Sequence, residues 1–158
     1  MRIIGIDPGF AIVGFGIIEY FSGKFSVIEY GQVTSPANTP IPARLKMVYD
    51  DISYIIDKHK PDCMAIEELF FGKNHTTAIN VAMARGALVL AGQNAGLDVA
   101  EYTPLQVKQA VVGYGRAEKS QVQQMVKLIL GLEKIPKPDD VADSLAIAIC
   151  HAHSSRRL

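Results

Sequence analysis

Short apolar runs at the start of the chain predict a sheet. Residues 3–7 form an apolar run that ends on an acid and is broken by Pro8-Gly9, which is typical of a strand buried on both faces and of the turn that ends it. Residues 12–20 and 25–33 alternate around Gly, Ser and Lys, and predict two antiparallel strands joined by a hairpin turn at Ser22-Gly23. The first three predicted strands therefore form a meander.

Helical periodicity dominates the rest of the chain. Apolar side chains recur at helical spacing, and we expect them to face the core, at Ile41, Leu45, Val48, Ile52 and Ile55 or Ile56. The Ala-rich residues 74–94 predict one helix, or two with a junction near Gly86. Further helices are expected at residues 104–112, 118–130 and 139–153, and further strands at 62–67 and 99–102. This order predicts an α/β fold, a mixed five-stranded sheet flanked by helices on both faces, in a single domain over residues 1–158.

The composition is that of an ordinary globular domain. The chain has 158 residues, of which 49% are hydrophobic and 20% charged. No apolar run approaches the roughly 20 residues of a membrane span, and the N-terminus lacks the pattern of a signal peptide, so we expect a cytoplasmic protein without a membrane partner. Cys63 and Cys150 match no metal-binding spacing and are predicted to be buried, reduced thiols.

The distribution of charge is more informative than the net charge. Lys plus Arg and Asp plus Glu both number 16, so the total charge points to no particular partner. Residues 105–137 carry six cations and two anions, whereas residues 1–104 carry eight cations and eleven anions. A basic stretch is usually a solvated helix face, and that interpretation stays open beside a nucleic-acid surface.

Two of the predicted strands end on a carboxylate, Asp7 and Glu67. Burying a carboxylate is costly unless a cation or hydrogen-bond donors hold it, so both acids are candidates for a site at the open end of the sheet. Asp7 before Pro8-Gly9 is also typical of a turn residue. If the helix between the two strands makes them parallel neighbours, the two carboxylates lie side by side.

Two more acids, Asp140 and Asp143, open the last predicted helix on one helical face. An acidic first turn also complements the helix dipole and is a routine helix start. The rest of this helix is almost wholly apolar, so we expect its acidic start to border the protein interior. If the four acids converge, each like-charge pair at about 4 Å costs about 4 kcal/mol at an effective dielectric constant of 20. Only divalent cations make such a cluster tolerable.

This set of ligands predicts a metal-dependent nuclease. Carboxylate oxygens without His or Cys favour Mg²⁺ or Mn²⁺ over zinc. Two such ions about 4 Å apart support in-line phosphodiester hydrolysis, because one activates water and the other stabilises the leaving oxygen. His151 and His153 point to different faces of the last helix and are expected to form a cationic helix end rather than a metal pair.

Five motifs carry a resemblance to a known family. They are Gly5-Ile6-Asp7-Pro8-Gly9, Ala65-Ile66-Glu67 with Phe70, Gln106-Val107-Lys108 with Val111-Val112-Gly113, Ala117-Glu118-Lys119-Ser120-Gln121-Val122, and Asp140-Val141-Ala142-Asp143. Together they cover nearly the whole chain and closely resemble the RuvC family of Holliday junction resolvases. The chain departs from the family at Val13-Gly14-Phe15, where Thr-Gly followed by Tyr or Trp is usual. None of the four acids is affected.

The resemblance implies an RNase H-like fold and a homodimer that makes symmetric paired nicks in four-way DNA junctions, in recombination and DNA repair. It implies two Mg²⁺ ions per active site, with Mn²⁺ as a substitute. On the matching positions it makes Asp7, Glu67, Asp140 and Asp143 the metal-binding catalytic acids, and it leaves open whether Asp139 joins them. It also implies contacts with the branch-migration proteins RuvA and RuvB.

Five residues are expected to contact DNA. The resemblance puts Phe70 near the junction, where an aromatic ring can stack on an unpaired base, and puts Lys108 and Lys119 on DNA. Lys73 belongs to a Lys-Asn motif that also fits the family, and Arg116 lies in the basic stretch. For Phe70, a core position remains the alternative, since aromatic residues that follow a strand are usually buried.

Two other protein classes share parts of this pattern. An actin-like or sugar-kinase ATPase begins with a similar strand, acid and turn, but needs a second phosphate-binding turn and a much longer chain. A non-catalytic junction- or RNA-binding relative with the same fold would keep the basic stretch and lack one or more acids, whereas all four acids are present here. The alternative that stays open is a non-catalytic or differently specific RNase H-fold nucleic-acid-binding protein. Arg85, in the motif Ala84-Arg85-Gly86, fits either the family's dimer-forming helix or a surface cation.

Overall fold

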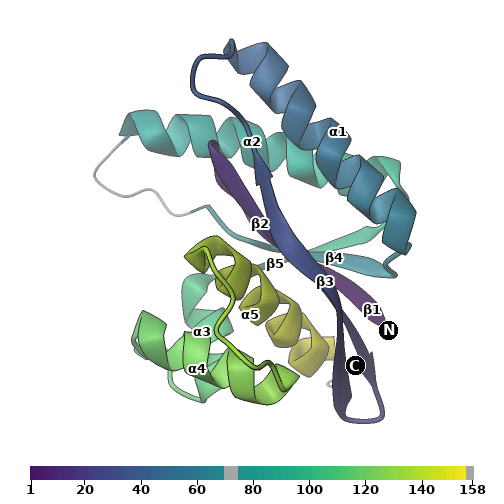
Figure 1. Ribbon diagram of the computed structural model, residues 1–158, viewed down its shortest axis with the longest axis vertical. Helices are drawn as coiled ribbons and strands as arrows, with labels where there is room; N and C mark the ends of the chain where they lie inside the picture. The colour runs from purple at the N-terminus through teal and green to yellow at the C-terminus, as the bar shows by residue number, and fades with distance from the viewer. Residues whose placement is uncertain (70–74, 156–158) are drawn as a thin grey trace.

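The computed structural model describes residues 1–69 and 75–155. Its strands form one sheet in the order β3-β2-β1-β4-β5 (Figure 1), namely β1 (Arg2–Asp7), β2 (Ile12–Phe21), β3 (Lys24–Thr34), β4 (Cys63–Glu67) and β5 (Asp98–Tyr102). The β1–β2 and β2–β3 pairs are antiparallel, and the β1–β4 and β4–β5 pairs are parallel. The predicted mixed five-stranded sheet is confirmed, with strand bounds that differ from the predicted ones by one or two residues.

The β2–β3 hairpin turns at Ser22-Gly23, as predicted. Both residues have positive φ angles, 48° and 85°, which is the backbone conformation that a two-residue hairpin turn requires. Phe21 and Lys24 close the turn as the last pair of the ladder. This hairpin projects from the sheet, away from the ends of β1 and β4 where the candidate acids lie (Figure 1).

Helices cover both faces of the sheet (Figure 1). One face carries α1 (Ile41–His59) and α2 (His75–Asn94), and the other carries α3 (Pro104–Val112), α4 (Lys119–Leu130) and α5 (Asp139–Ser154). Of the two alternatives for residues 74–94, the single helix is correct, because α2 continues through Gly86. Within the described residues, no helix is both long and apolar enough to cross a membrane.

The buried stripe of α1 differs from the predicted stripe at its start. Val48, Ile52 and Ile56 are buried, as predicted. Ile41 is 42% exposed, so its predicted core position is wrong. The buried face repeats every four residues from position 44, and this places Arg44, at 7% exposure, where an apolar residue was expected.

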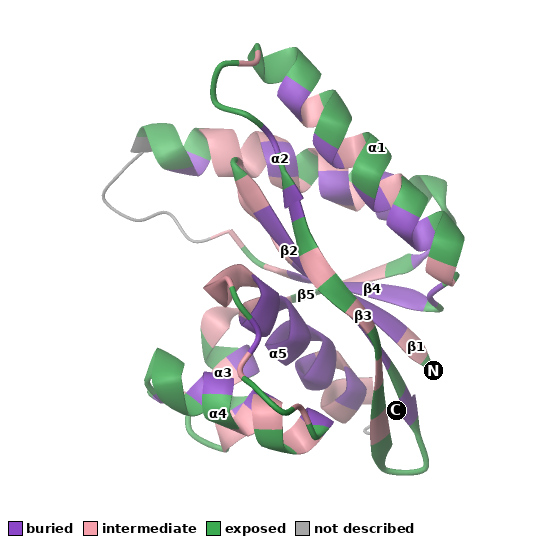
Figure 2. Ribbon diagram, in the orientation of Figure 1, coloured by how far each residue is buried: buried purple, intermediate pink, exposed green. Residues whose placement is uncertain are grey.

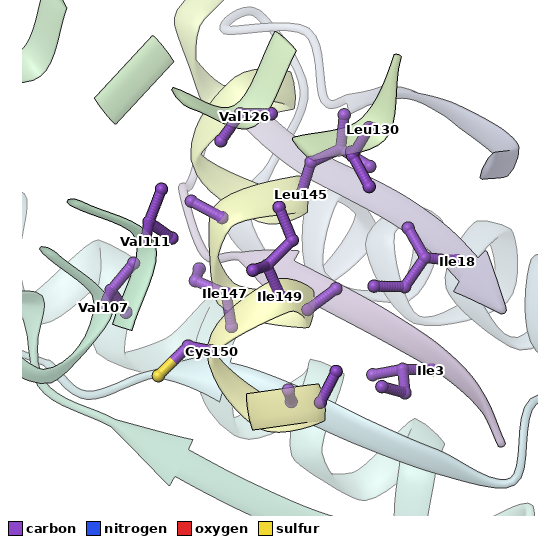
Figure 3. Packing of buried hydrophobic residues seen from close by; sticks show 14 of the residues in the cluster. Ile3, Ile18, Val107, Val111, Val126, Leu130, Leu145, Ile147, Ile149 and Cys150 are labelled. Carbon is purple, nitrogen blue, oxygen red and sulfur yellow. The ribbon is translucent and has the colours of Figure 1, made fainter. Parts of the chain in front are cut away.

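α5 is the most deeply buried helix (Figure 2). Its side chains form one core cluster with those of β1, β2, α3 and α4 (Figure 3), among them Ile3, Ile18, Val107, Val111, Val126, Leu130, Leu145, Ile147 and Ile149. A second cluster, between the opposite face of the sheet and α1 and α2, contains Ile4, Ile6 and Ile52. The apolar run of α5 therefore serves to hold the helix against the centre of the sheet.

Glycines in the central strands let α5 approach the sheet closely. A Cβ atom on Gly5 would lie 2.1 Å from the carbonyl oxygen of Ser144, and one on Gly14 would lie 2.0 Å from the carbonyl oxygen of Asp140. Real Cβ atoms essentially never approach other atoms below 3.0 Å, so any larger residue would force the helix away. The acidic start of α5 is thereby held against β2, beside the end of β1.

The C-terminal end of α5 holds a partly buried polar cluster. Cys63 and Cys150 are buried and free, as predicted. The ring of His151 lies between two partners, with Nδ1 2.8 Å from Tyr102 Oη and Nε2 3.3 Å from Cys63 Sγ. Burial lowers the pKa of His151 below its usual value. The predicted cationic helix end is therefore wrong for His151, because this residue faces the sheet rather than solvent.

Candidate active site

The parallel pairing of β1 and β4 brings two acids to one edge of the sheet. Ile6 pairs with Ile66 at the end of the ladder, so the next residues, Asp7 and Glu67, end neighbouring strands. Both strands are apolar up to this point because they lie between two helical layers. The predicted side-by-side arrangement of the two strand ends is confirmed.

The start of α5 brings the other two acids to the same place. Asp7 pairs with Gly14 across the β1–β2 ladder, and the backbone of Asp140 rests on Gly14. Asp143 follows one helical turn later on the same face. The N-cap residue is Pro138, and no side chain caps the helix, so neither Asp140 nor Asp143 is engaged as an N-cap.

The electrostatics show that the four acids act on one another. Burial, followed by the negative charges of Asp143, Glu67 and Asp140, raises the pKa of Asp7 to about 8, while the positive charge of Lys119 opposes the rise. Burial, followed by the charge of Asp143, also raises the pKa of Glu67. A carboxyl group with a pKa near 8 keeps its proton at neutral pH unless a cation compensates the surrounding charge.

Lys119, the first residue of α4, brings a positive charge to these acids. Its Nζ lies 2.9 Å from Asp143 Oδ2 and 3.6 Å from Asp139 Oδ2. Partial burial of Lys119 favours the neutral amine, but the contacts with Asp143 and Asp139 outweigh it and raise the pKa of this lysine. For Asp143, burial raises the pKa more strongly than the bond from Lys119 lowers it.

Asp139 acts on Asp143 but is not among the acids that act on Asp7. Its Oδ1 accepts a hydrogen bond of 2.8 Å from Lys137, and this contact holds the pKa of Asp139 below its usual value. The acids that act on Asp7 are Asp143, Glu67 and Asp140. The structure therefore favours Asp140 and Asp143 over Asp139 as the pair that faces the strand ends.

A cavity of about 180 Å³ joins the acids to the basic residues. Its polar lining comes from Glu67, Asp143, Lys108 and Lys119, and its apolar wall from Pro104, Val107, Val122 and Ala146. α3 begins at Pro104 behind a capping box between Thr103 and Gln106, and its residue Lys108 lines this cavity. Two lysines predicted to contact DNA thus lie beside two of the predicted catalytic acids.

The donor set of the four acids fits a hard divalent cation. All side-chain donors are carboxylate oxygens, the ligands that Mg²⁺ and Mn²⁺ prefer. Across residues 1–69 and 75–155, no three acidic, histidine or cysteine side chains are placed so that they could hold a metal ion together. The acids lie near enough to act on Asp7, and Asp143 is paired with Lys119. Burial, and after it the charge of the neighbouring acids, raises the pKa values of Asp7, Glu67 and Asp143, and a bound cation would favour their charged forms.

Of the three other residues predicted to contact DNA, Arg116 lies within the described part of the chain. Arg116 is exposed in the connection between α3 and α4, after the left-handed residue Gly113 that ends α3. Phe70 and Lys73 lie outside the described residues, so their predicted roles stay predictions. The DNA contacts assigned to Lys108, Arg116 and Lys119 also remain predictions.

Two arginines lie near the site, and the sequence interpretation missed one of them, Arg44. Arg85 of α2 donates from Nε to the backbone oxygen of Glu67 at 3.0 Å and also pairs with Glu101. Its side chain is only 18% exposed, so the surface-cation alternative is wrong. Arg44 of α1 is buried against Phe10, in the turn that follows Asp7. The family motif pointed to Arg85, whereas no sequence signal marked Arg44.

Comparison with known proteins identifies the family. The family model described as crossover junction endodeoxyribonuclease RuvC matches residues 3–151. The chain is 61% identical to the crossover junction endodeoxyribonuclease RuvC of Clostridioides difficile, over 99% of this chain and 92% of that protein. It is 58% identical to the protein of the same name from Ruminiclostridium cellulolyticum, over 99% of this chain and 94% of that protein.

A solved structure matches the fold along nearly the whole chain. The T. thermophilus RuvC in complex with Holliday junction substrate superimposes with a TM-score of 0.95 at 35% sequence identity, over 99% of this chain and 96% of that one. The match confirms the predicted RNase H-like fold. With the sequence, the sheet topology and the cluster of acids in agreement, the chain belongs to the RuvC family of crossover junction endodeoxyribonucleases.

Proposed function

We propose that this protein is a structure-specific endonuclease that resolves Holliday junctions by symmetric paired nicks in homologous recombination and DNA repair. The observation that carries the proposal is the convergence of Asp7, Glu67, Asp140 and Asp143 at one sheet edge, beside a cavity lined by two lysines. Membership of the RuvC family supports this choice of DNA, as does the close match to the T. thermophilus RuvC solved in complex with Holliday junction substrate.

The metal-binding residues of this proposal are Asp7, Glu67, Asp140 and Asp143, which would hold two Mg²⁺ ions, with Mn²⁺ as a substitute. When bound, the ions would supply an activated water and charge neutralisation at the leaving oxygen. The support is the set of four mutually repelling carboxylates, two of them on rigid strand ends and two on a helix fixed against the sheet.

The basic residues of the cavity would act on the DNA backbone. Lys119 and Lys108 lie beside Glu67 and Asp143, where a phosphate entering the site would meet their positive charge. The apolar wall formed by Pro104, Val107 and Val122 would limit the water around the reacting phosphate, which strengthens these interactions. Arg116, Lys73 and Phe70 are also assigned to DNA contacts, with Phe70 near the junction, where its ring would stack on an unpaired base.

Assembly and location follow from the same proposal. Two symmetric nicks in one junction require two sites related by a two-fold axis, so the active form is a homodimer. Contacts with RuvA and RuvB are retained from the family resemblance, and the cytoplasmic location expected from the sequence agrees with a DNA substrate. The second candidate is a non-catalytic or differently specific RNase H-fold nucleic-acid-binding protein. The four acids at one edge speak against the non-catalytic form, and membership of the RuvC family speaks against a different specificity.

The proposal is tested by offering the protein three substrates. A synthetic mobile four-way junction, a linear duplex and an RNA–DNA hybrid are incubated with Mg²⁺ or with EDTA. The expected result is paired, symmetric nicks in the junction alone, and only with Mg²⁺. Cutting of the hybrid, or tight junction binding without cutting, would refute the proposal and favour the second candidate.

A further inference from the structure

The guanidinium of Arg44 is buried although it lies on a surface helix. Only 7% of the residue is exposed, whereas arginine is almost never fully buried without a partner. The partners that the structure gives it are neutral. Nε donates to Ser35 Oγ at 3.0 Å, Nη2 donates to the backbone oxygen of Ser35 at 3.0 Å, and Cζ lies 3.9 Å from the ring centroid of Phe10.

Ser35 connects Arg44 to the turn between β1 and β2. Its hydroxyl donates to the backbone oxygen of Phe10 at 2.5 Å, and its backbone N–H donates to the backbone oxygen of Ala11 at 2.9 Å. Ser35 is only 3% exposed, so water competes little for these bonds. Two successive carbonyl groups of the turn are therefore held by one serine, and Arg44 holds that serine by two of its own atoms.

The turn held in this way begins at the residue after Asp7. The sheet fixes the N-terminal side of Asp7, because β1 pairs with β2 and β4 along its length. Residues 8–11 lie between β1 and β2, where the C-terminal side of Asp7 must be fixed by other contacts. This turn is tight, since a Cβ atom on Gly9 would lie 2.0 Å from the backbone oxygen of Ile12.

We propose that Arg44 is a positioning residue for the Asp7 carboxylate. Arg44 donates two hydrogen bonds to Ser35 and packs against the Phe10 ring. These contacts fix the turn of residues 8–11 and thereby the direction in which Asp7 points. The role rests on the proposed function, in which Asp7 is a catalytic acid. Arg44 itself is buried and touches neither substrate nor metal.

The geometry explains why arginine is needed at this position. A planar guanidinium donates in two directions at once and presents a flat face to an aromatic ring. A lysine ammonium keeps the charge but replaces the planar fork by a single point of donation, and methionine keeps much of the volume without any donor. Arg44→Lys should therefore retain part of the effect, and Arg44→Met none of it.

The test compares Arg44→Met, Arg44→Lys and Ser35→Ala with a matched control on the same helix. Val48→Ala removes a side chain that is 1% exposed one turn along α1, packed in the core cluster rather than on the turn. For each variant, kcat and KM are measured on a four-way junction below the unfolding temperature, and deuterium uptake is measured for residues 8–11.

The expected result is a loss of kcat at unchanged KM. Arg44→Met should lower kcat by about tenfold or more, since small misplacements of a reacting group have large effects on rate. Ser35→Ala should act in the same direction, and both variants should speed exchange in the turn, whereas Arg44→Lys should recover part of the rate. Val48→Ala should lower the unfolding temperature but keep kcat within about twofold.

Two results would overturn the role. The first is a kcat within about twofold of wild type in both Arg44→Met and Ser35→Ala. The second is a loss of kcat in Val48→Ala as large as that in Arg44→Met, when the two variants are destabilised equally. If Arg44→Met does not fold, Ser35→Ala and Arg44→Lys decide. Failure of the wild-type protein to cut the junction would instead refute the proposed function, and this role with it.

Discussion

The contact between Gly14 and α5 makes a sharp prediction about the position of the acids. In Gly14→Ala, the new Cβ atom would lie 2.0 Å from the backbone oxygen of Asp140, 2.4 Å from its carbonyl carbon and 3.1 Å from its Cβ. Ordinary contact begins at 3.4 Å, so the start of α5 must move away from β2 by about 1.4 Å. The obstacle is backbone, which cannot avoid the clash by changing rotamer.

This displacement should reduce cleavage more than it reduces folding. Overpacking of this kind costs about 1–3 kcal/mol of unfolding free energy. A misplacement of about 1 Å in a catalytic group can reduce the rate about 100-fold. We therefore expect Gly14→Ala to cut junctions about 100-fold more slowly at saturating Mg²⁺, while its junction affinity stays near the wild-type value because Lys108 and Lys119 lie on α3 and α4.

A matched variant separates displacement of the acids from general destabilisation. In Gly16→Ala, the new Cβ atom meets the side chain of Leu145 at 2.5 Å and its backbone nitrogen only at 3.3 Å, so the backbone of α5 has to move much less than in Gly14→Ala. Both variants are assayed by chemical denaturation and by single-turnover cleavage. The reasoning would be refuted if the two variants were equally stable and lost cleavage equally. A cleavage rate of Gly14→Ala near the wild-type rate would refute it as well.

Three further predictions concern charge. Because the pKa of Asp7 is raised to about 8 in the folded protein, folding takes up a proton between about pH 4 and pH 8, and stability falls as the pH rises through that window. In EDTA, Asp7→Asn should therefore have a higher unfolding temperature than wild type, and the difference should be larger at pH 8 than at pH 5. A difference that does not depend on pH would contradict the raised pKa. Lys119→Gln should slow cleavage about 100-fold, as loss of a donor to a reacting oxygen does, and a wild-type single-turnover rate would exclude Lys119 from the site. Lys108→Ala should flatten the salt dependence of junction binding by about one unit of slope, while Lys24→Ala, in the distant hairpin, should not.

The sequence predicted those features that depend on local pattern. The strands that end at Asp7 and Glu67 were visible because apolar runs and turn residues are local signals, and their parallel pairing followed from the helix between them. The acids of α5 were visible as a D-x-x-D pattern at the start of an apolar helix. The five motifs, taken together along the chain, indicated the RuvC family.

Features that depend on contacts between distant segments could not be predicted in this way. Arg44 is buried because Ser35 and Phe10 meet it from two other segments, and a cation in an amphipathic helix otherwise indicates a solvent face. Ile41 was assigned to the core because its spacing from Leu45 is helical, but the buried face starts at position 44. The bond between Lys119 and Asp143 joins α4 to α5, and their relative placement is set by the core between them.

The central claim is that four acids at the ends of β1, β4 and the start of α5 form one metal-dependent junction-cutting site. The most direct test is to measure junction binding and cleavage in parallel for wild type and Asp7→Asn in Mg²⁺. The claim predicts paired symmetric nicks by wild type, and binding of wild-type affinity without nicks by the variant. Cleavage by Asp7→Asn at the wild-type rate, or a wild type that binds the junction and never cuts it, would contradict the claim.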